Sequence, residues 1–463
     1  MTSSSSMHDT VAAVATPAGA GGVGVVRISG PRAFDVLRKV VTDWPEQTPS
    51  HTLRLSTIRA ADGAPLDHGL AVWFKAPSSY TGEDVVELQC HGGPVIMQGV
   101  LEATLAHGAR VANPGEFTQR AFLNGRLDLT QAEAVADLVT ATSKSAHKLA
   151  MEHLQGNLGD AMRAHRDKLA EAATLIEAAL DFSHEEHVYQ IERDEVRARL
   201  DGVLRALYGL RDKFDQGRRQ REGVRVVLTG PTNAGKSTLF NALYGSDRAI
   251  VTAVAGTTRD FLEEQLNLGG AAVRLVDTAG LRETEDEVES IGIERSRQWM
   301  QRADIVVRVV DQFQPLDDAQ RQQIEALLED ARPVLLVLNK GDLPCGLASD
   351  DQTLCARFEH AVQCALAAHP PQGMDRLIEA LGGMAKALTQ SEGVLISRAR
   401  HMQCVGDGID AIERALDALD AGMEHELVAL DVRDALDALG QMVGYVSADD
   451  ILHRIFAEFC VGK

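Results

Sequence analysis

Residues 224 to 238 read VRVVLTGPTNAGKST and contain four residues whose types and spacing suit phosphate binding: Gly230, Gly235, Lys236 and Ser237. Together they complete the pattern G-x-x-x-x-G-K-[ST] of a P-loop. Glycines let backbone N–H groups turn toward phosphate oxygens, the lysine bridges the terminal phosphates, and the serine hydroxyl ligates Mg²⁺. The flanking residues predict the strand and the helix that a P-loop requires, from Val224 to Thr229 and from Ser237 to Tyr244.

Two further patterns follow the P-loop in the order that a GTPase requires. In GTTRD, Thr257 and Thr258 can present a hydroxyl and a carbonyl to Mg²⁺ and a γ-phosphate. In VRLVDTAG, Asp277 ends an expected strand and suits a water-mediated contact to Mg²⁺, while the N–H of Gly280 suits the γ-phosphate. Leu281 comes next and has no group to orient an attacking water. Hydrolysis is therefore expected to need another carboxylate, a cation or a partner.

A third pattern suits recognition of a guanine base. Asn339, Lys340 and Asp342 form N-K-x-D after an expected strand, and a carboxylate there accepts hydrogen bonds from guanine N1–H and its exocyclic amine. Adenine N1 is an acceptor, so GTP is favoured over ATP. The Ser-Ala-Lys expected after the next strand is replaced by three residues that we take as its equivalents, Cys364, Ala365 and Leu366.

Composition limits the class of protein. The chain has 463 residues, 45% hydrophobic and 24% charged, which predicts a globular protein of several domains. Its net charge of -21 argues against a nonspecific nucleic-acid coat protein. The six cysteines lack zinc-site spacing and are interpreted as reduced thiols. No window is apolar enough to span a membrane and the first residues do not resemble a signal peptide, so we expect a cytoplasmic protein.

Alternating patterns predict a multidomain α/β protein. Short apolar runs from Thr10 to about Asn124 predict strands, and Pro94 to His107 and Glu116 to Leu123 are more helical, so an α+β domain is expected. Helical spacing dominates from Leu129 to about Gly217 and from about Arg398 to Leu439. The nucleotide-binding block between them is therefore expected to be an insertion in a helical domain. The expected boundaries are 1–124 for the N-terminal domain, 125–222 and 387–463 for the helical domain, and 223–386 for the G domain.

The order of the motifs resembles one family of GTPases. GPTNAGKST, AGTTRD, DTAGLRETEDEVESIGIERS and NKGD are accompanied by the N-terminal DTVAAVATPAGAGGVGVVRISG, by SYTGEDVVELQCHGG and PGEFTQRAFLNGRLDLTQAEAVADL, and by the terminal FCVGK. In these segments the chain resembles the MnmE (TrmE) family of tRNA-modifying GTPases essentially from end to end. The resemblance implies an N-terminal α+β domain that binds folate and dimerises, an α-helical domain, and an inserted P-loop GTPase domain with a Ras-like α/β sheet.

The resemblance also implies a reaction. GTP hydrolysis would be coupled to the installation of an aminomethyl or carboxymethylaminomethyl group at C5 of a tRNA wobble uridine. The partner would be the flavoprotein MnmG, which carries FAD and forms a heterotetramer with the dimer, and the one-carbon donor a tetrahydrofolate derivative (5,10-methylene or 5-formyl). The folate contacts carry over to Arg27, Glu87, Arg126 and Lys463. Cys460 would be a candidate reactive thiol, delivered by an apolar helical stripe that includes Leu452 and Phe456.

For hydrolysis, the resemblance implies that K⁺ replaces an arginine finger. Asn233 would ligate K⁺ with backbone carbonyls near Thr252, Val254 and Thr257, and Glu289 would position the attacking water. Ser237 and Thr258 would hold Mg²⁺, and Lys236 would complete the catalytic set with Asn233 and Glu289. The whole expected GTP-binding set is Asn233, Ala234, Gly235, Lys236, Ser237, Thr238, Thr252, Thr257, Thr258, Asp277, Thr278, Ala279, Gly280, Asn339, Lys340, Asp342, Cys364, Ala365 and Leu366.

Two other functions fit some of the same residues. One is a GTP-dependent binding switch in ribosome assembly or stress regulation, which would use hydrolysis only to change shape. The acidic balance and the folate-like N-terminal half count against it. The other is a folate enzyme with a vestigial G domain, which the intact Lys236, Ser237, Asp277 and Asp342 disfavour.

Overall fold

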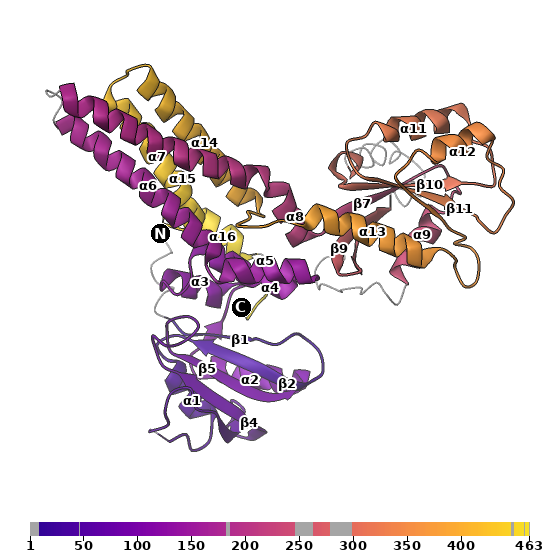
Figure 1. The fold of residues 1–463 in the computed structure, drawn as a ribbon. Helices are drawn as coiled ribbons and strands as arrows, with labels where there is room; N and C mark the ends of the chain where they lie inside the picture. The colour runs from indigo at the N-terminus through magenta and orange to yellow at the C-terminus, as the bar shows by residue number, and fades with distance from the viewer. Residues whose placement is uncertain are drawn as a thin grey trace, which may run out of the picture. The chain divides into compact units, whose positions relative to one another are not determined.

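The computed structural model describes residues 9–45, 47–181, 186–245, 263–277, 299–445, 449–457 and 459–462. The chain divides into two compact units (Figure 1). The first consists of Met1–Ala136, His153–Arg166 and Leu439–Lys463, and the second of Asp137–Glu152 and Asp167–Ala438. Within these described residues, each unit contains one six-stranded sheet. Among the described helices, none is both long and apolar enough to cross a membrane.

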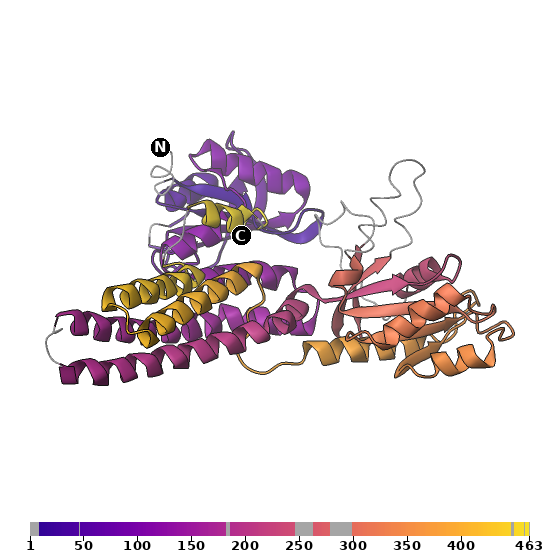
Figure 2. The same ribbon diagram turned by 90° about the horizontal axis from the view of Figure 1, so that it is seen from above.

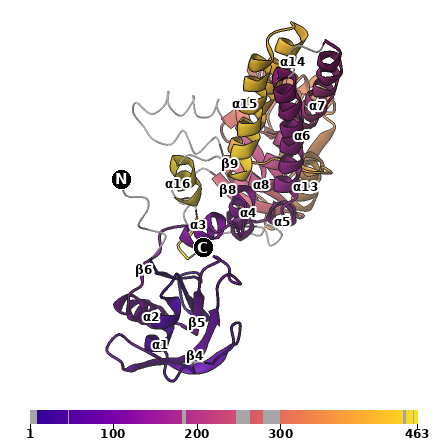
Figure 3. The same ribbon diagram turned by 90° about the vertical axis from the view of Figure 1, so that its left-hand side faces the viewer.

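The sheet of the first unit has the strand order β3-β4-β5-β2-β1-β6. The strands are β1 (Val11–Val14), β2 (Gly21–Ser29), β3 (Arg54–Arg59), β4 (Pro65–Phe74), β5 (Val85–Gly92) and β6 (Arg110–Val111). Neighbouring strands are antiparallel except for β1 and β6, which are parallel. Helices α1 (Ala33–Val40) and α2 (Pro94–Ala106) pack together on one face and share a core with the sheet (Figure 3). The predicted α+β fold of this segment is confirmed.

Helix α1 was not predicted. Ala33, Val36, Leu37 and Val40 repeat at three- and four-residue spacing, and all of them are buried. The periodicity that indicates an amphipathic helix is thus present in eight residues. Because this segment is short and has strand-like patterns on both sides, the sequence did not indicate a helix there.

The C-terminal helix of the first unit completes a separate apolar core. Helix α16 (Asp449–Ala457) packs near α3 (Glu116–Leu123) and the start of α4 (Leu129–Thr140). Leu452, Phe456 and Phe459 are each less than 9% exposed, which confirms that the predicted stripe is core packing. The helix therefore anchors the last residues of the chain within this unit.

Long helices make up much of the second unit, and the division of the chain into units falls within some of them. They are α5 (Lys144–Leu154), α6 (Asn157–Asp181), α7 (Glu186–Asp212), α8 (Phe214–Glu222), α14 (Ala399–Asp420) and α15 (His425–Val443). Figures 1 and 2 show α6, α7, α14 and α15 running alongside one another. Ion pairs join neighbours in this bundle, such as Arg199 with Glu171 at 3.1 Å and Arg414 with Asp431 at 2.8 Å. The predicted long helices are confirmed, and a break near Gly156 separates α5 from α6.

The second sheet carries the predicted P-loop. Its strands are β7 (Val224–Thr229), β8 (Glu263–Leu268), β9 (Ala271–Asp277), β10 (Ile305–Asp311), β11 (Val334–Asn339) and β12 (His360–Gln363), in the order β12-β11-β10-β7-β9-β8. All pairs are parallel except β8 with β9. One face is covered by α9 (Lys236–Tyr244) and α13 (Met374–Thr389), and the other by α11 (Asp318–Leu328) and α12 (Ser349–Cys355). Parallel strands end at one edge, which is where α/β sheets bind ligands.

A buried carboxylate joins α8 to this sheet. Asp304 is 5% exposed and precedes β10. Its carboxylate accepts hydrogen bonds from Arg218 and Arg219, each at 2.8 Å, and from the backbone N–H of Arg225 at 2.9 Å. Burial alone would raise the pKa of Asp304, but the hydrogen bonds outweigh it and hold the pKa below its ordinary value. The carboxylate is therefore charged in the folded protein at neutral pH.

Replacing Asp304 with asparagine is expected to lower the free energy of unfolding by about 3 kcal/mol near pH 7, because a buried ion pair loses one partner. Since the folded pKa is lowered, the contribution of Asp304 is present above the unfolded pKa of about 4 and disappears as the pH falls through the folded pKa. Urea unfolding should show that the difference in free energy of unfolding between the wild type and Asp304→Asn is smaller in acid than near neutral pH. Asp215→Asn is the matched control, because Asp215 pairs with the same Arg218 but is 63% exposed. Equal losses in both variants would contradict the assignment.

Candidate nucleotide-binding site

The P-loop lies between β7 and α9 and needs glycine at two positions. Gly230 has a φ of 145°, and a Cβ there would lie 2.4 Å from the backbone oxygen of Val309. Gly235 has a φ of 98°, and a Cβ there would lie 2.1 Å from Nδ2 of Asn339. Gly235 is also the N-cap residue of α9 and has no side chain that could accept hydrogen bonds from the backbone N–H groups of the first turn. Such a helix terminus favours bound anions.

Lys236 folds back across this loop. It is 9% exposed, and its Nζ donates hydrogen bonds to the backbone oxygens of Gly230 at 3.0 Å and Pro231 at 2.7 Å. A cation inside a ring of backbone groups suits the terminal phosphates of a nucleotide. Ser237 and Thr238 follow in the first turn of α9 and are exposed. Asn233, with a φ of 61°, is also exposed, and the buried Ala234 separates it from Gly235.

Asn339 links the P-loop to the loop on the guanine side. It is the last residue of β11 and is 4% exposed. Its Nδ2 donates to the backbone oxygen of Ala234 at 2.8 Å, and its Oδ1 accepts the N–H of Leu366 at 3.2 Å. The sequence indicated Asn339 only as part of the base-recognition pattern. In the structure, Asn339 also positions these two loops relative to each other, and no local sequence pattern indicates that role.

The remaining residues of the guanine pattern lie next to Asn339. The backbone N–H of Gly341 donates to the oxygen of Cys364 at 2.8 Å, so the loops after β11 and β12 are joined. Lys340 has a φ of 65° and its Nζ contacts Asp311 at 2.5 Å, while Asp342 is exposed. Burial raises the pKa of Cys364 to about 11, so this thiol stays protonated and contributes an apolar surface. Ala365 is also buried, and an open cavity of about 540 Å³ lies beside this loop.

Part of the predicted site lies outside the described residues. This holds for Thr252, Val254, Thr257, Thr258, Thr278, Ala279, Gly280 and Glu289. Asp277 ends β9 beside β7 in the sheet, but its side chain is outside the described part as well. Of the expected K⁺ ligands the described part contains Asn233, and of the expected Mg²⁺ ligands it contains Ser237. Their exposed oxygens at the P-loop and the α9 terminus have the donor chemistry that these cations bind.

In the first unit, two predicted folate residues meet the C-terminus. Arg27 pairs with Glu87, with its Nε at 2.9 Å and its Nη2 at 2.8 Å from Oε1. Its Nη1 donates to the backbone oxygen of Gly462 at 3.5 Å. Lys463 lies outside the described residues, but the residue before it contacts Arg27. The expected convergence of Arg27, Glu87 and the terminal segment is therefore observed up to Gly462.

Tyr80 was not predicted as a site residue, although it stands inside SYTGEDVVELQCHGG. The guanidinium of Arg27 lies 5.6 Å from the centre of its ring. Tyr80 also lines an open cavity of about 460 Å³ together with His51 and Arg126. Tyr80 is therefore next to Arg27 and lines the same cavity as Arg126. An exposed Arg126 and an aromatic wall are suitable for a flat, anionic ligand.

Cys460 is a free thiol. It is exposed, and its backbone oxygen accepts the N–H of Gly115 at 3.5 Å. The preceding Phe459 is buried, so the thiol is carried on a fixed end of the chain. This arrangement leaves Cys460 accessible close to Gly462 and the Arg27 pair.

Comparison with known proteins places both units in one family. The model of the MnmE helical domain matches residues 129–460, and the model of the GTP-binding protein TrmE N-terminus matches residues 10–126. The tRNA modification GTPase MnmE of Azoarcus sp. (strain BH72) is 43% identical over 458 residues, which cover 98% of each chain. The protein of the same name from Chlorobium chlorochromatii is 41% identical, again over 98% of each chain.

Some solved structures are also similar to part of the chain. Aquifex aeolicus Era, bound to GDP.AlF4-, is 22% identical with a TM-score of 0.27 and covers 40% of this chain and 66% of its own. The FeoB G-domain of Methanococcus jannaschii is 23% identical with a TM-score of 0.25 and covers 35% of this chain and 97% of its own. The family models and the full-length relatives are the decisive matches, and this chain belongs to the MnmE family of tRNA modification GTPases.

Proposed function

We propose that the protein is a K⁺-stimulated GTPase that works with the flavoprotein MnmG in the cytoplasm. It uses a tetrahydrofolate one-carbon unit to install an aminomethyl or carboxymethylaminomethyl group at C5 of a tRNA wobble uridine. The proposal keeps the three-domain division, with the G domain at residues 223–386 inserted in the helical domain.

The hydrogen bonds that Asn339 makes to two loops are the main support for the GTPase part of this proposal. One buried side chain holds Ala234 of the P-loop and Leu366 of the base-side loop at hydrogen-bond distance. Lys236 and the α9 terminus then face the phosphates, and the exposed Asp342 is free to accept hydrogen bonds from guanine. These groups act by position and charge, which is how phosphoryl transfer is catalysed.

Two exposed residues of the described part, Asn233 and Ser237, support the expected ion sites. Ser237 and Thr258 would hold Mg²⁺, and Asn233 with the carbonyls of Thr252, Val254 and Thr257 would hold K⁺. Both ions would neutralise charge that develops on the phosphate oxygens. Lys236 would bind the terminal phosphates, and Glu289 would orient the attacking water.

GTP hydrolysis is expected to be at least about tenfold faster in KCl than in NaCl of equal ionic strength, because a monovalent cation replaces an arginine finger. Steady-state phosphate release at saturating GTP measures the difference. GTP affinity should be nearly equal in the two salts, which separates a catalytic effect from a binding effect. Equal rates would remove K⁺ from the mechanism.

The first unit supports the folate and dimer parts of the proposal. The paired Arg27 and Glu87 offer a cation and a carboxylate beside Tyr80 for a polar, flat ligand. Leu55 and Leu70 are register partners on β3 and β4, and they are 76% and 38% exposed. Because β3 is an edge strand, an apolar patch there suits contact with a second copy. Sedimentation of the purified protein as a monomer would contradict dimerisation.

The decisive experiment measures wobble nucleosides by mass spectrometry in a strain that lacks the gene. Wild-type protein should restore the modified uridine, and Arg27→Ala should not, although its GTP hydrolysis in vitro stays unchanged. Restoration by Arg27→Ala would exclude the folate assignment. Wobble nucleosides that do not change when the gene is deleted would favour the GTP-dependent binding switch instead.

A further inference from the structure

One arginine of the second unit is buried without an acidic partner among the described residues. Arg308, in the middle of β10, is 6% exposed. Its Nη2 donates to Oε1 of Gln323 at 3.0 Å, while its buried Nε has no hydrogen-bond acceptor among the described residues. Within that part of the chain no carboxylate forms an ion pair with it. Burial lowers the pKa of Arg308, opposed only by the more distant Asp317.

This arrangement differs from that of Arg120, a buried arginine of the first unit. Arg120 is 5% exposed, but it forms ion pairs with Asp9, Glu83 and Glu116 at 2.6 to 3.0 Å. A buried guanidinium that lacks such partners is unfavourable, because it has lost its hydration without gaining a counter-charge. An acceptor that reaches Arg308 would therefore be bound strongly.

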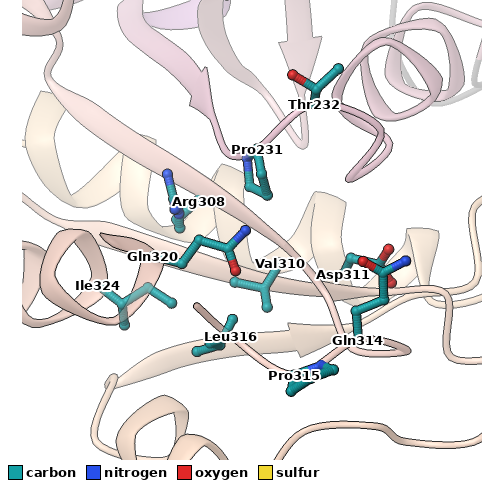
Figure 4. Close-up of a pocket in the computed structure, with 10 residues that line it drawn as sticks. All are labelled: Pro231, Thr232, Arg308, Val310, Asp311, Gln314, Pro315, Leu316, Gln320 and Ile324. Carbon is teal, nitrogen blue, oxygen red and sulfur yellow. The ribbon is translucent and has the colours of Figure 1, made fainter. Parts of the chain in front are cut away.

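A cavity lies directly against Arg308. Figure 4 shows it between β10 and the segment that carries Gln314 and Gln320, with Pro231 and Thr232 of the P-loop in its lining. The cavity volume is about 60 Å³, several times the ~10–15 Å³ that one water needs. It therefore has room for a small polyatomic ion.

The lining supplies hydrogen-bond donors and little competing negative charge. Oε1 of Gln320 accepts the N–H of Asp317, so its amide nitrogen can donate to a ligand. Gln314 and the exposed Thr232 add an amide and a hydroxyl. Asp311 also lines the cavity, but Nζ of Lys340 lies 2.5 Å from its carboxylate and balances its charge.

We propose that this cavity is a second anion site of the G domain, in which Arg308 binds a small oxyanion, phosphate or carboxylate, beside Pro231 and Thr232. The site is separate from the nucleotide-phosphate site, and the proposal does not depend on tRNA modification. Pro231 links the two sites, because its backbone oxygen accepts a hydrogen bond from Lys236. An ion against Pro231 would therefore touch the segment that positions Lys236.

The test uses the full-length protein saturated with GDP and Mg²⁺, so that the P-loop is already occupied. Inorganic phosphate and acetate are titrated separately against chloride of equal ionic strength, with melting temperature and calorimetric heat as readouts. If only phosphate gives saturable stabilisation, the cavity is a phosphate site. If only acetate does, it is a carboxylate site. If both do, it is a general oxyanion site. No stabilisation beyond that of chloride would overturn the proposal.

Variants assign the effect to the cavity. Arg308→Met should weaken anion binding by ~10- to 100-fold, the loss expected for a charged hydrogen bond. Arg321→Met is the matched control, because Arg321 is an arginine of α11 that pairs with Asp318 and Asp351 but is 40% exposed and outside the cavity lining. If Arg308→Met fails to fold, Gln320→Ala should still weaken binding without removing the charge. Wild-type affinity in both cavity variants would refute the site.

Discussion

Replacing Lys236 with alanine is expected to lower GTP turnover by roughly 10²–10³-fold, the loss typical of removing one group that stabilises transition-state charge. Nζ of Lys236 lies inside the P-loop, where it contacts the backbone oxygens of Gly230 and Pro231. These are charge-assisted hydrogen bonds to neutral carbonyls, and terminal phosphates carry far more negative charge. The ammonium should therefore transfer to the phosphates when nucleotide binds.

Single-turnover hydrolysis with enzyme in excess measures this loss separately from product release. Lys386→Ala provides the control, because Lys386 is an exposed lysine in the last turn of α13 in the same domain. Its turnover should match that of the wild type. A Lys236→Ala protein that unfolds at the wild-type temperature but hydrolyses GTP within a factor of about two of the wild type would disprove the role.

Asn339→Ala is expected to destabilise the G domain by about 1–3 kcal/mol and to weaken nucleotide binding as well. The substitution leaves the oxygen of Ala234 and the N–H of Leu366 without their present partner. Both atoms are buried, so each loses a hydrogen bond that water cannot easily replace. The P-loop and the base-side loop would then no longer be fixed to each other.

Asp342→Ala provides the comparison that separates positioning from base recognition. Asp342 is exposed, so its removal should leave the free energy of unfolding nearly unchanged. The preference of the Asp342→Ala protein for GDP over ADP should fall by about 10²-fold or more, because the carboxylate that accepts hydrogen bonds from guanine is removed. Urea unfolding and competition between the two nucleotides measure both quantities. Asn339→Ala with wild-type stability, or Asp342→Ala with wild-type selectivity, would contradict this division of roles.

Much of the nucleotide site was predictable because it is local. The strand Val224–Thr229 and the helix that follows the P-loop are read from a run of fewer than twenty positions, and both are confirmed. The apolar stripe around Phe456 likewise follows from helical periodicity alone. Where signals from strands and helices overlap within a few residues, as at Ala33–Val40, the prediction failed.

Relations between distant segments were not predictable from spacing. Arg27 and Gly462 are 435 positions apart, and only the packing of α16 brings the C-terminus to β2. The family resemblance implied that they meet, but it did not indicate Tyr80 beside them. Aromatic residues have no spacing that distinguishes a binding wall from a core position.

By itself, the sequence determined the order of the motifs, the alternation of strands and helices, and the kind of chemistry that Lys236, Ser237 and Asp342 can perform. These properties depend on residue type and on neighbours within one or two turns of the chain. Only the tertiary structure decided that Asn339 holds two loops together and that Arg308 is buried with no counter-ion in the described part of the chain. Burial and hydrogen-bond partners arise from packing between segments far apart in the chain, and an isolated asparagine or arginine in a strand carries no sign of either.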